Sequence, residues 1–222
     1  AISDCPFVVF SDIIETTDTA RHSHGKFPAL GWGEKDGTVT NSERRISRQR
    51  AIMPPPGEAR HDWWIVCETA KRMGFEEGFT YANPAAIFRE HAALSAFENA
   101  GARDFDIGGL AAISDAAFDA LEPVQWPFLA GTAPVDRRFF ADGGFFTADR
   151  KGRFIALEPP ALKEATTPDF PLRLNTGRIR DQWHTMTRTG MSPRLATHLP
   201  EPFVEVHPED ATRAGLVDGG FA

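Results

Sequence analysis

The main helical stretch of this 222-residue chain runs from Asp62 to Leu121. Apolar residues recur there at spacings of three and four, which predicts three short helices. Before and after this stretch, glycine and proline interrupt the apolar runs, so that short strands and loops are expected. A coiled coil, a collagen-like chain and a disordered chain are excluded, because 41% of the residues are hydrophobic and 25% are charged.

Each predicted helix has a start signal. Asp62 is the expected N-cap of a first helix that stops at Gly74, and its apolar stripe comprises Trp63, Val66, Cys67, Ala70 and Met73. Asn83-Pro84 begins a second helix that ends before Gly101, with the stripe Ile87, Phe88, Leu94 and Phe97. Ser114-Asp115 opens a third helix through Leu121. Cys67 is expected to be a buried thiol.

Near the N-terminus, Phe7 to Phe10 is a short apolar run typical of a strand that is buried on both faces in a parallel sheet. Ser11 and Asp12 follow at its carboxyl end, where ligands bind in open α/β sheets. The simpler alternative, favoured by the residues alone, is that both side chains cap the turn. A short helix through about His22 is expected next.

The rest of the chain is predicted to be irregular. Residues 31–61 are polar and rich in glycine and arginine, which predicts a long loop. Residues 123–168 are expected to form loops with brief strands at 138–140, 144–147 and 153–157. Two further strands are expected, at 170–174 and 203–207. A short helix is predicted from Pro208 to Gly215.

Composition excludes several functions. Lys+Arg 24 against Asp+Glu 31 leaves a net charge of -7, which argues against nucleic acid as a partner. No apolar run approaches the roughly 20 residues of a membrane span, and no signal peptide is visible, so a cytoplasmic location without a membrane partner is expected. His22 and His24 have no third ligand nearby, and neither cysteine lies in a CxxC motif, so no metal site is predicted.

Two arginine-rich segments stand out against this acidic background. Residues 41–61 hold five arginines and two glutamates, a local charge of +3, behind the glycine-rich turn that carries Lys35. A solvated charged loop is the default interpretation, and donors for an anionic ligand are the alternative. Residues 173–194 hold five arginines and one acid, a local charge of +4. Their threonines, Gly177 and arginines would suit a pyrophosphate, with Trp183 or His184 against a ring. Neither segment is a Walker A loop or a GxGxxG motif. The residues alone predict an anion or a nucleotide-like ligand and do not identify it further.

These two segments also carry a family resemblance. GWGEKDGTVTNSERRISRQR and LNTGRIRDQWHTMTRTG resemble bacterial assimilatory nitrate reductases, within the DMSO reductase family of molybdopterin oxidoreductases. GEARHDWWIVCETAKRMGF, IFREHAALSAFENAGARDFDIGGL and EPFVEVHPEDATRAGL extend the similarity along the whole chain. The resemblance implies an enzyme that reduces nitrate to nitrite by oxygen-atom transfer. It would hold molybdenum-bis(molybdopterin guanine dinucleotide) and a 4Fe-4S cluster. An electron donor protein or a reductase domain would supply the enzyme with electrons.

The resemblance also implies which residues contact the cofactor. Asp12 and Asp62 would accept from N–H groups of guanine or pterin, while Lys35 and Arg178 would meet phosphate. The full set of expected cofactor contacts is Ser11, Asp12, Lys35, Asp62, Thr176, Gly177, Arg178, Ile179, Arg180, Asp181, Gln182, Trp183, His184 and Thr185. No catalytic residue and no metal ligand is assigned, because the family's cluster-binding cysteine motif and molybdenum thiolate have no counterpart in this sequence.

The implied fold is α/β, and the chain is expected to be a central to C-terminal piece of the catalytic subunit. Residues 1–61 would be the end of a Rossmann-like α/β cofactor-binding domain, and residues 62–166 a helical connection. Residues 167–222 would be the start of a β-barrel-like domain that binds molybdopterin dinucleotide. Two alternatives stay open: a formate dehydrogenase of the same family, and, for the isolated piece, a non-catalytic nucleotide-binding module.

Overall fold

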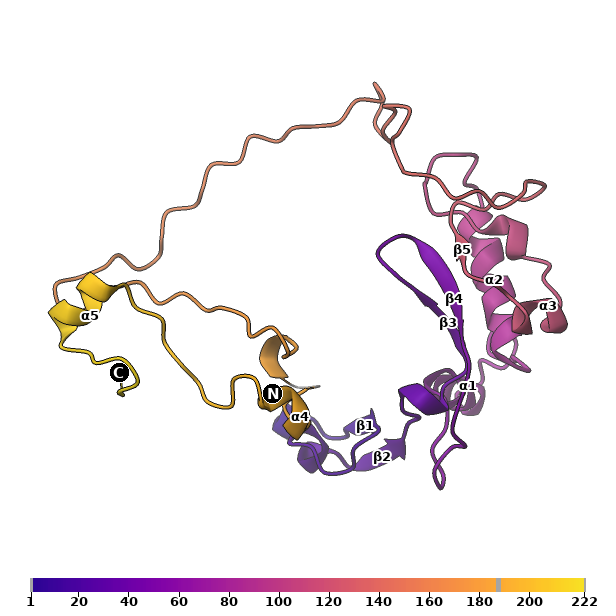
Figure 1. Cartoon of the computed structure of the whole chain (residues 1–222). Coiled ribbons are helices and arrows are strands. Elements are labelled where there is room, and N and C mark those ends of the chain that lie inside the picture. The colour runs from indigo at the N-terminus through magenta and orange to yellow at the C-terminus, as the bar shows by residue number, and fades with distance from the viewer. Residues whose placement is uncertain (1, 187–188, 222) are drawn as a thin grey trace. The chain divides into compact units, whose positions relative to one another are not determined.

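The computed structural model describes residues 2–186 and 189–221. The chain separates into two compact units, with the division between Ile155 and Ala156. The fold is mixed α/β with small sheets, and the described residues contain no closed barrel. Among the described residues, strands β1 to β5 and helices α1 to α3 lie in the first unit, and α4 and α5 lie in the second. Figure 1 labels these elements along the chain.

The first unit begins with a two-stranded parallel sheet. β1 (Val9–Asp12) pairs with β2 (Gly25–Pro28), and Val9 lies opposite Gly25. The predicted strand is confirmed, but its burial on both faces is wrong, because the Val9 side chain is 47% exposed. A two-stranded sheet leaves both of its faces largely uncovered. The flanking 3₁₀-helices are η1 (Ile2–Asp4) and η2 (Thr19–His22), and η2 is the short helix expected through about His22.

Residues 31–61 do not form the predicted loop. They contain the 3₁₀-helix η3 (Trp32–Glu34) and a hairpin of β3 (Gly37–Thr40) and β4 (Arg45–Gln49). Asn41 Oδ1 closes the turn by accepting from the backbone N–H groups of Glu43 and Arg45. The short strand β5 (Val124–Gln125) pairs with β4 as a third strand. The hairpin was missed because Ile46 is the one fully buried side chain of β4 among polar neighbours, so no apolar alternation is visible.

The three predicted helices are present: α1 (Asp62–Arg72), α2 (Pro84–Ala96) and α3 (Asp115–Asp119). Asn83 and Ser114 cap the second and third helices through bonds from the N–H groups of Ala86 and Ala117, as expected. The N-cap assignment of Asp62 is wrong. His61 occupies that position, and Asp62 is the first helical residue, where a negative charge favours the helix dipole.

The core of this unit is small and lies between the hairpin and α2. It comprises Ile46, Ala85, Phe88, Ala92, Ile107, Leu110, Phe118 and Val124, drawn from β4, α2, the 3₁₀-helix η4 (Gly108–Leu110), α3 and β5. The predicted stripe of α2 is partly wrong, because Leu94 and Phe97 are more than 60% exposed. The buried face of α2 instead carries small residues, Ala92 and Ser95, which permit close approach but contribute little to a hydrophobic pattern.

The stripe of α1 divides in the same way. Cys67 and Ala70 are buried, as predicted, whereas Val66 and Met73 are exposed. The hydrophobic pattern predicted the helix correctly. It overestimated how much of the apolar stripe of the helix is buried by the rest of this chain.

An aromatic series occupies residues 105–146, where brief strands were expected. Ring centroids lie 5.1 Å apart for Phe105 and Trp126, and 5.6 Å apart for Trp126 and Phe139. The series continues through Phe140, whose ring stacks on Phe145 at 4.6 Å. No strand forms at 138–140, 144–147 or 153–157. Side-chain stacking rather than backbone pairing organises this part, and it provides a structural use for several of the 18 phenylalanines.

The second unit is built from turns and short helices. Its elements are the 3₁₀-helix η5 (His184–Met186), α4 (Pro193–Ala196) and α5 (Pro208–Ala214). Gly215 ends α5 in the left-handed conformation, as predicted. The strands predicted at 170–174 and 203–207 are absent, because these segments have no neighbouring strand to pair with among the described residues. No helix in the described parts of the chain is long and apolar enough to cross a membrane.

Tyr81, the single tyrosine of the sequence, offers a spectroscopic probe of the connection between α1 and α2. Its hydroxyl donates to Glu90 Oε2 at 2.5 Å, and this bond raises the pKa of Tyr81 to about 12. The tyrosinate absorbance of Tyr81 is measured as the difference between the wild type and Tyr81→Phe. We expect this absorbance to rise near pH 12. In Glu90→Gln, the midpoint of the titration should move toward pH 10. The pKa is raised in the folded state, so this contact stabilises fully below about pH 10 and is lost as the pH rises toward 12. An unchanged midpoint in Glu90→Gln would contradict the assignment.

Candidate functional site

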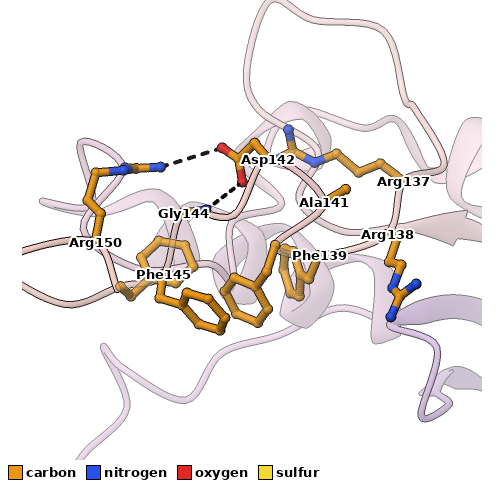
Figure 2. Close-up of a pocket in the computed structure, with 10 residues that line it drawn as sticks. Arg137, Arg138, Phe139, Ala141, Asp142, Gly144, Phe145 and Arg150 are labelled. Carbon is orange, nitrogen blue, oxygen red and sulfur yellow. Dashed lines mark hydrogen bonds and ion pairs between the residues drawn. The ribbon is translucent and has the colours of Figure 1, made fainter. Parts of the chain in front are cut away.

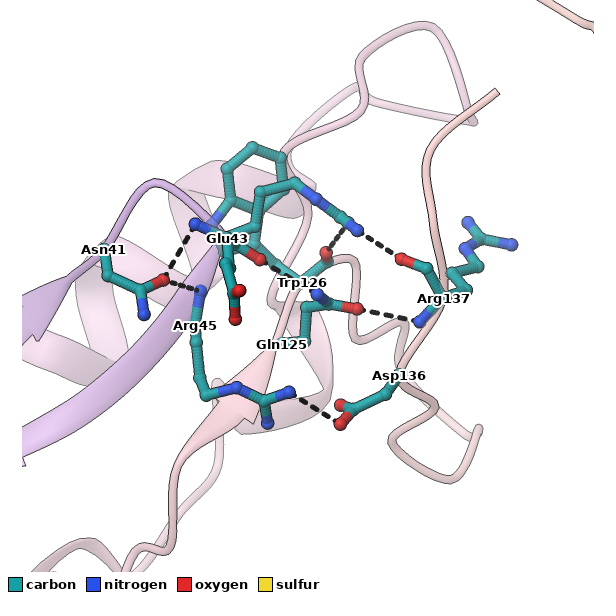
Figure 3. A network of polar contacts seen from close by, with 8 residues as sticks. Asn41, Glu43, Arg45, Gln125, Trp126, Asp136 and Arg137 are labelled. Atoms are coloured by element: carbon teal, nitrogen blue, oxygen red, sulfur yellow. Dashed lines mark hydrogen bonds and ion pairs between the residues drawn. The ribbon is translucent and has the colours of Figure 1, made fainter. Parts of the chain in front are cut away.

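The arginines of the first basic segment are bound within their own unit. Arg44 donates to the carbonyl oxygens of Trp126 and Arg137, and its guanidinium lies 3.7 Å from the Phe139 ring centroid. Arg45 pairs with Asp136 at 2.6 Å, as Figure 3 shows. Gln125 joins the same network, donating to the Glu43 carbonyl and accepting from the Arg137 N–H. These contacts fasten the hairpin turn to residues 125–137.

Arg48 has a buried side chain, only 2% exposed. It pairs with Asp36 at 2.7 Å and with Asp119 at 3.0 Å, and its guanidinium lies over the Phe118 ring at 4.1 Å. Arg50 donates to the Asp119 carbonyl, and Arg60 to the Ala59 carbonyl. Neither a solvated charged loop nor a set of free ligand donors describes this segment, because each of its five arginines has a partner in the chain.

Two expected cofactor contacts, Lys35 and Asp62, meet in this unit. Lys35 follows η3, Asp62 begins α1, and Lys35 Nζ lies 2.6 Å from Asp62 Oδ2. His61 is adjacent, and burial lowers its pKa. The ion pair is partly exposed, so it contributes no more than about 1 kcal/mol, and a ligand group could displace it at little cost.

Ser11 and Asp12 are the last two residues of β1, whereas they were predicted to follow the strand. Asp12 Oδ1 accepts from the backbone N–H groups of Ile13 at 2.6 Å and Ile14 at 3.3 Å. The turn-capping alternative is therefore observed for Asp12. Ser11 lies on the exposed side of the strand end.

In the second unit, two residues of the predicted contact segment bind their own chain. Arg180 and Asp181 form a forked ion pair, with Nε–Oδ1 at 2.9 Å and a second bond at 3.1 Å. His198 Nδ1 lies 3.1 Å from Asp181 Oδ2, the oxygen that also accepts the second Arg180 bond. The Arg180 guanidinium is the main cause of the lowered pKa of Asp181.

Gln182 is also turned inward and is buried. Its Nε2 donates to the Leu195 carbonyl at 3.1 Å, and its Oε1 accepts from the Thr189 hydroxyl at 2.6 Å. Trp183 and His184 are exposed beside it, with ring centroids 4.7 Å apart. Of the other predicted contacts, Thr176, Gly177, Arg178 and Thr185 are exposed, and Ile179 is half-buried.

Three arginines of the second segment differ from those of the first. Within the described residues, the guanidinium groups of Arg173, Arg178 and Arg194 have no hydrogen-bond or ion-pair partner, and all three side chains are exposed. Arg188, the fifth arginine of the segment, lies outside the described residues. The two basic segments look alike as sequences, but only the second presents free guanidinium donors.

Sequence reasoning missed one further feature, a hollow of about 320 Å³ in the first unit. Figure 2 shows its lining, in which Asp142 accepts from the Gly144 N–H and pairs with Arg150 at 3.5 Å. Phenylalanines of the aromatic series form its apolar side, and Arg137 and Arg138 border it. The neighbouring motifs Arg-Arg-Phe-Phe and Gly-Gly-Phe-Phe were the available signal. None of the predicted cofactor contacts lines this hollow.

Metal ligands are a separate question. Among residues 2–186 and 189–221, no group of three or more His, Cys, Asp or Glu side chains is arranged to hold a metal ion. Cys5 is exposed and Cys67 is buried, and neither forms a disulfide.

The two thiols should therefore differ in reactivity. Burial raises the pKa of Cys67, which lowers its thiolate fraction and its access to reagents. We expect a maleimide to label Cys5 on the order of a hundredfold faster than Cys67, as measured by peptide mass spectrometry at neutral pH. Denaturant should remove the difference. Equal labelling rates before denaturation would contradict the packing of α1.

Comparisons with known proteins match both ends of the chain. The molybdopterin oxidoreductase family profile matches residues 1–72, and the molybdopterin dinucleotide binding domain profile matches residues 172–221. The chain therefore carries a region of the molybdopterin oxidoreductase family, followed by a region of the molybdopterin dinucleotide binding domain family.

Among curated relatives, a nitrate reductase from Klebsiella oxytoca is 54% identical over 224 residues, and one from Shewanella frigidimarina is 45% identical over 225. Both alignments cover 100% of this chain. An F420-dependent formate dehydrogenase subunit alpha from Methanocaldococcus jannaschii is 31% identical over 225 residues, covering 99% of this chain and 30% of that protein. The chain spans 25% and 24% of the lengths of the two nitrate reductases.

Proposed function

We propose that this chain is part of a molybdenum-dependent nitrate reductase and that its second unit binds molybdopterin guanine dinucleotide. The observation that carries the proposal is that the second unit has both free guanidinium groups, those of Arg173, Arg178 and Arg194, and an exposed ring pair, Trp183 and His184. Guanidinium donors match phosphate oxygens, and exposed rings offer a stacking surface for a planar base. The higher identity to nitrate reductases than to the formate dehydrogenase favours nitrate as the substrate.

The residues present fit the cofactor in part, and each unit is considered by itself. In the second unit, Arg178 would donate to phosphate, and Trp183 or His184 would lie against a ring. In the first unit, Lys35 would donate to phosphate, and Asp62 would accept from a guanine or pterin N–H. Asp181 and Gln182 fit less well, because their polar atoms already bind Arg180, His198, Thr189 and Leu195. The remaining expected contacts, Ser11, Asp12, Thr176, Gly177, Ile179, Arg180 and Thr185, stay predictions.

The cofactor's molybdenum, when bound, supplies the centre that accepts the oxygen atom of nitrate. Reduction of nitrate to nitrite and water consumes two electrons and two protons, so an electron donor protein or reductase domain is part of the proposal. The chain's own contribution is to bind and orient the dinucleotide. A 4Fe-4S cluster with ligands outside this chain, a role in nitrate assimilation and a cytoplasmic location complete the proposed enzyme.

The proposed domain organisation follows the same reasoning. Residues 1–61 would end a Rossmann-like domain, which the parallel pairing of β1 and β2 supports. Residues 62–166 would form the helical connection, and residues 167–222 the start of the barrel-like dinucleotide-binding domain.

The test is a direct analysis of the full-length gene product. We expect acid hydrolysis to release two guanosine monophosphates per molybdenum, and a reduced viologen dye to support nitrate reduction. Formate oxidation without nitrate reduction would favour the formate dehydrogenase alternative. Guanine nucleotide without molybdenum would favour a non-catalytic binding module, and absence of guanine nucleotide would overturn the proposal.

A further inference from the structure

Gln182 and Thr189 form a polar contact within the second unit, and the Gln182 side chain is buried. The Thr189 hydroxyl donates to Gln182 Oε1 at 2.6 Å and accepts from the backbone N–H of Trp183 at 3.0 Å. Gln182 Nε2 donates to the Leu195 carbonyl at 3.1 Å. Gln182 is 6% exposed, and both ends of its amide group have a partner.

These bonds tie together the parts of the unit that face outward. Trp183 and His184 follow Gln182 directly, and their rings are exposed. At the other end, Leu195 follows Arg194, one of the three arginines with a free guanidinium. The buried amide of Gln182 therefore joins two backbone segments. One precedes the Trp183–His184 ring pair, and the other follows Arg194. Buried polar groups whose hydrogen bonds are all made favour a single backbone conformation, because any other conformation would leave a buried group without a hydrogen-bond partner.

We propose that Gln182 and Thr189 are positioning residues, which hold the Trp183–His184 ring pair and Arg194 for the guanine dinucleotide without contacting it. This inference rests on the proposed dinucleotide binding. It replaces the expectation that Gln182 contacts the cofactor, because the Gln182 amide is buried and already occupied. It also gives Thr189, which was not among the expected contacts, a specific role.

The test compares Thr189→Val with Thr189→Ser in the full-length gene product. Valine keeps the shape and removes the hydroxyl, whereas serine keeps the hydroxyl. We expect Thr189→Val to lower the guanosine monophosphate released per chain by about tenfold, and Thr189→Ser to restore it to near the wild-type value. Thr212→Val is the matched control, because the Thr212 hydroxyl bonds only to the Pro208 carbonyl within α5, and it should change nothing.

The outcomes separate the two proposals. If Thr189→Val retains the wild-type amount while Arg178→Ala loses nucleotide, the positioning role is wrong and dinucleotide binding stands. If neither variant loses nucleotide, the proposed binding site itself is wrong. If Thr189→Ser releases as little guanosine monophosphate per chain as Thr189→Val, the positioning role is also wrong. If Thr189→Val does not fold, Thr189→Ala takes its place. Alanine removes the hydroxyl without placing a methyl group against Gln182 and Trp183. The result is again compared with Thr189→Ser.

Discussion

Replacing Arg178 with alanine is expected to lower the guanine nucleotide retained by the full-length gene product about tenfold to a hundredfold. A hydrogen bond between a guanidinium and a phosphate contributes about 1.5–3 kcal/mol, and about 1.4 kcal/mol corresponds to a factor of ten. Arg178 has no partner among the described residues, so its removal breaks no contact within them. The loss should therefore appear in nucleotide content, measured as guanosine monophosphate released per chain after gel filtration, while the melting temperature of the nucleotide-free protein stays unchanged.

Two further variants sharpen this test. Arg178→Lys keeps the charge and loses the forked donor geometry, so it should give an intermediate loss. Arg213→Ala removes another exposed arginine of the same unit, one that pairs with Asp210 in α5, and should leave nucleotide content unchanged. Equal nucleotide content in Arg178→Ala and Arg213→Ala would show that Arg178 does not meet a phosphate.

Replacing Arg48 with alanine is expected to destabilise the packing of the hairpin by about 2 kcal/mol. The substitution removes a buried guanidinium that joins Asp36, Asp119 and the face of Phe118. The effect should fall below the about 3–5 kcal/mol typical of a fully buried pair, because the Asp36 and Asp119 side chains are 36% and 77% exposed and can be rehydrated.

Amide hydrogen exchange of β3 and β4 is the suitable measurement, because it reports local opening in a protein of several units. A loss of about 2 kcal/mol corresponds to exchange about thirtyfold faster. Arg153→Ala is the control, since Arg153 is exposed and has no hydrogen-bond or ion-pair partner in the described part of the chain. Unchanged protection of the hairpin in Arg48→Ala would mean that Arg48 does not hold it in place.

Local signals predicted the helices well and the strands poorly. Asn83, Ser114 and Gly215 mark helix ends because each acts on backbone groups within a few residues. β4 was missed because its formation depends on Gly37 to Thr40 on one side and Val124 on the other. The strands predicted at 170–174 and 203–207 failed for the converse reason, since an extended apolar segment without a partner forms no ladder.

The candidate site shows the same division. The sequence predicted that the second basic segment binds an anion or a nucleotide-like ligand, and its free arginines are consistent with that prediction. It could not separate this segment from the first, which has a similar composition. It also placed Gln182 among the contacts, although the side chain faces inward and binds Thr189 and Leu195.

The sequence by itself determined the family resemblance, the helix ends and the positions where positive charge accumulates in an acidic chain. Only the tertiary structure decided which of those charges are already bound. Arg44, Arg45 and Arg48 find partners 71 to 93 residues further along the chain, at Arg137, Asp136 and Asp119. Arg178 finds none among the described residues. The physical reason is that an ion pair depends on distance in space, and a local pattern of residues carries no information about a partner that folding brings from so far away.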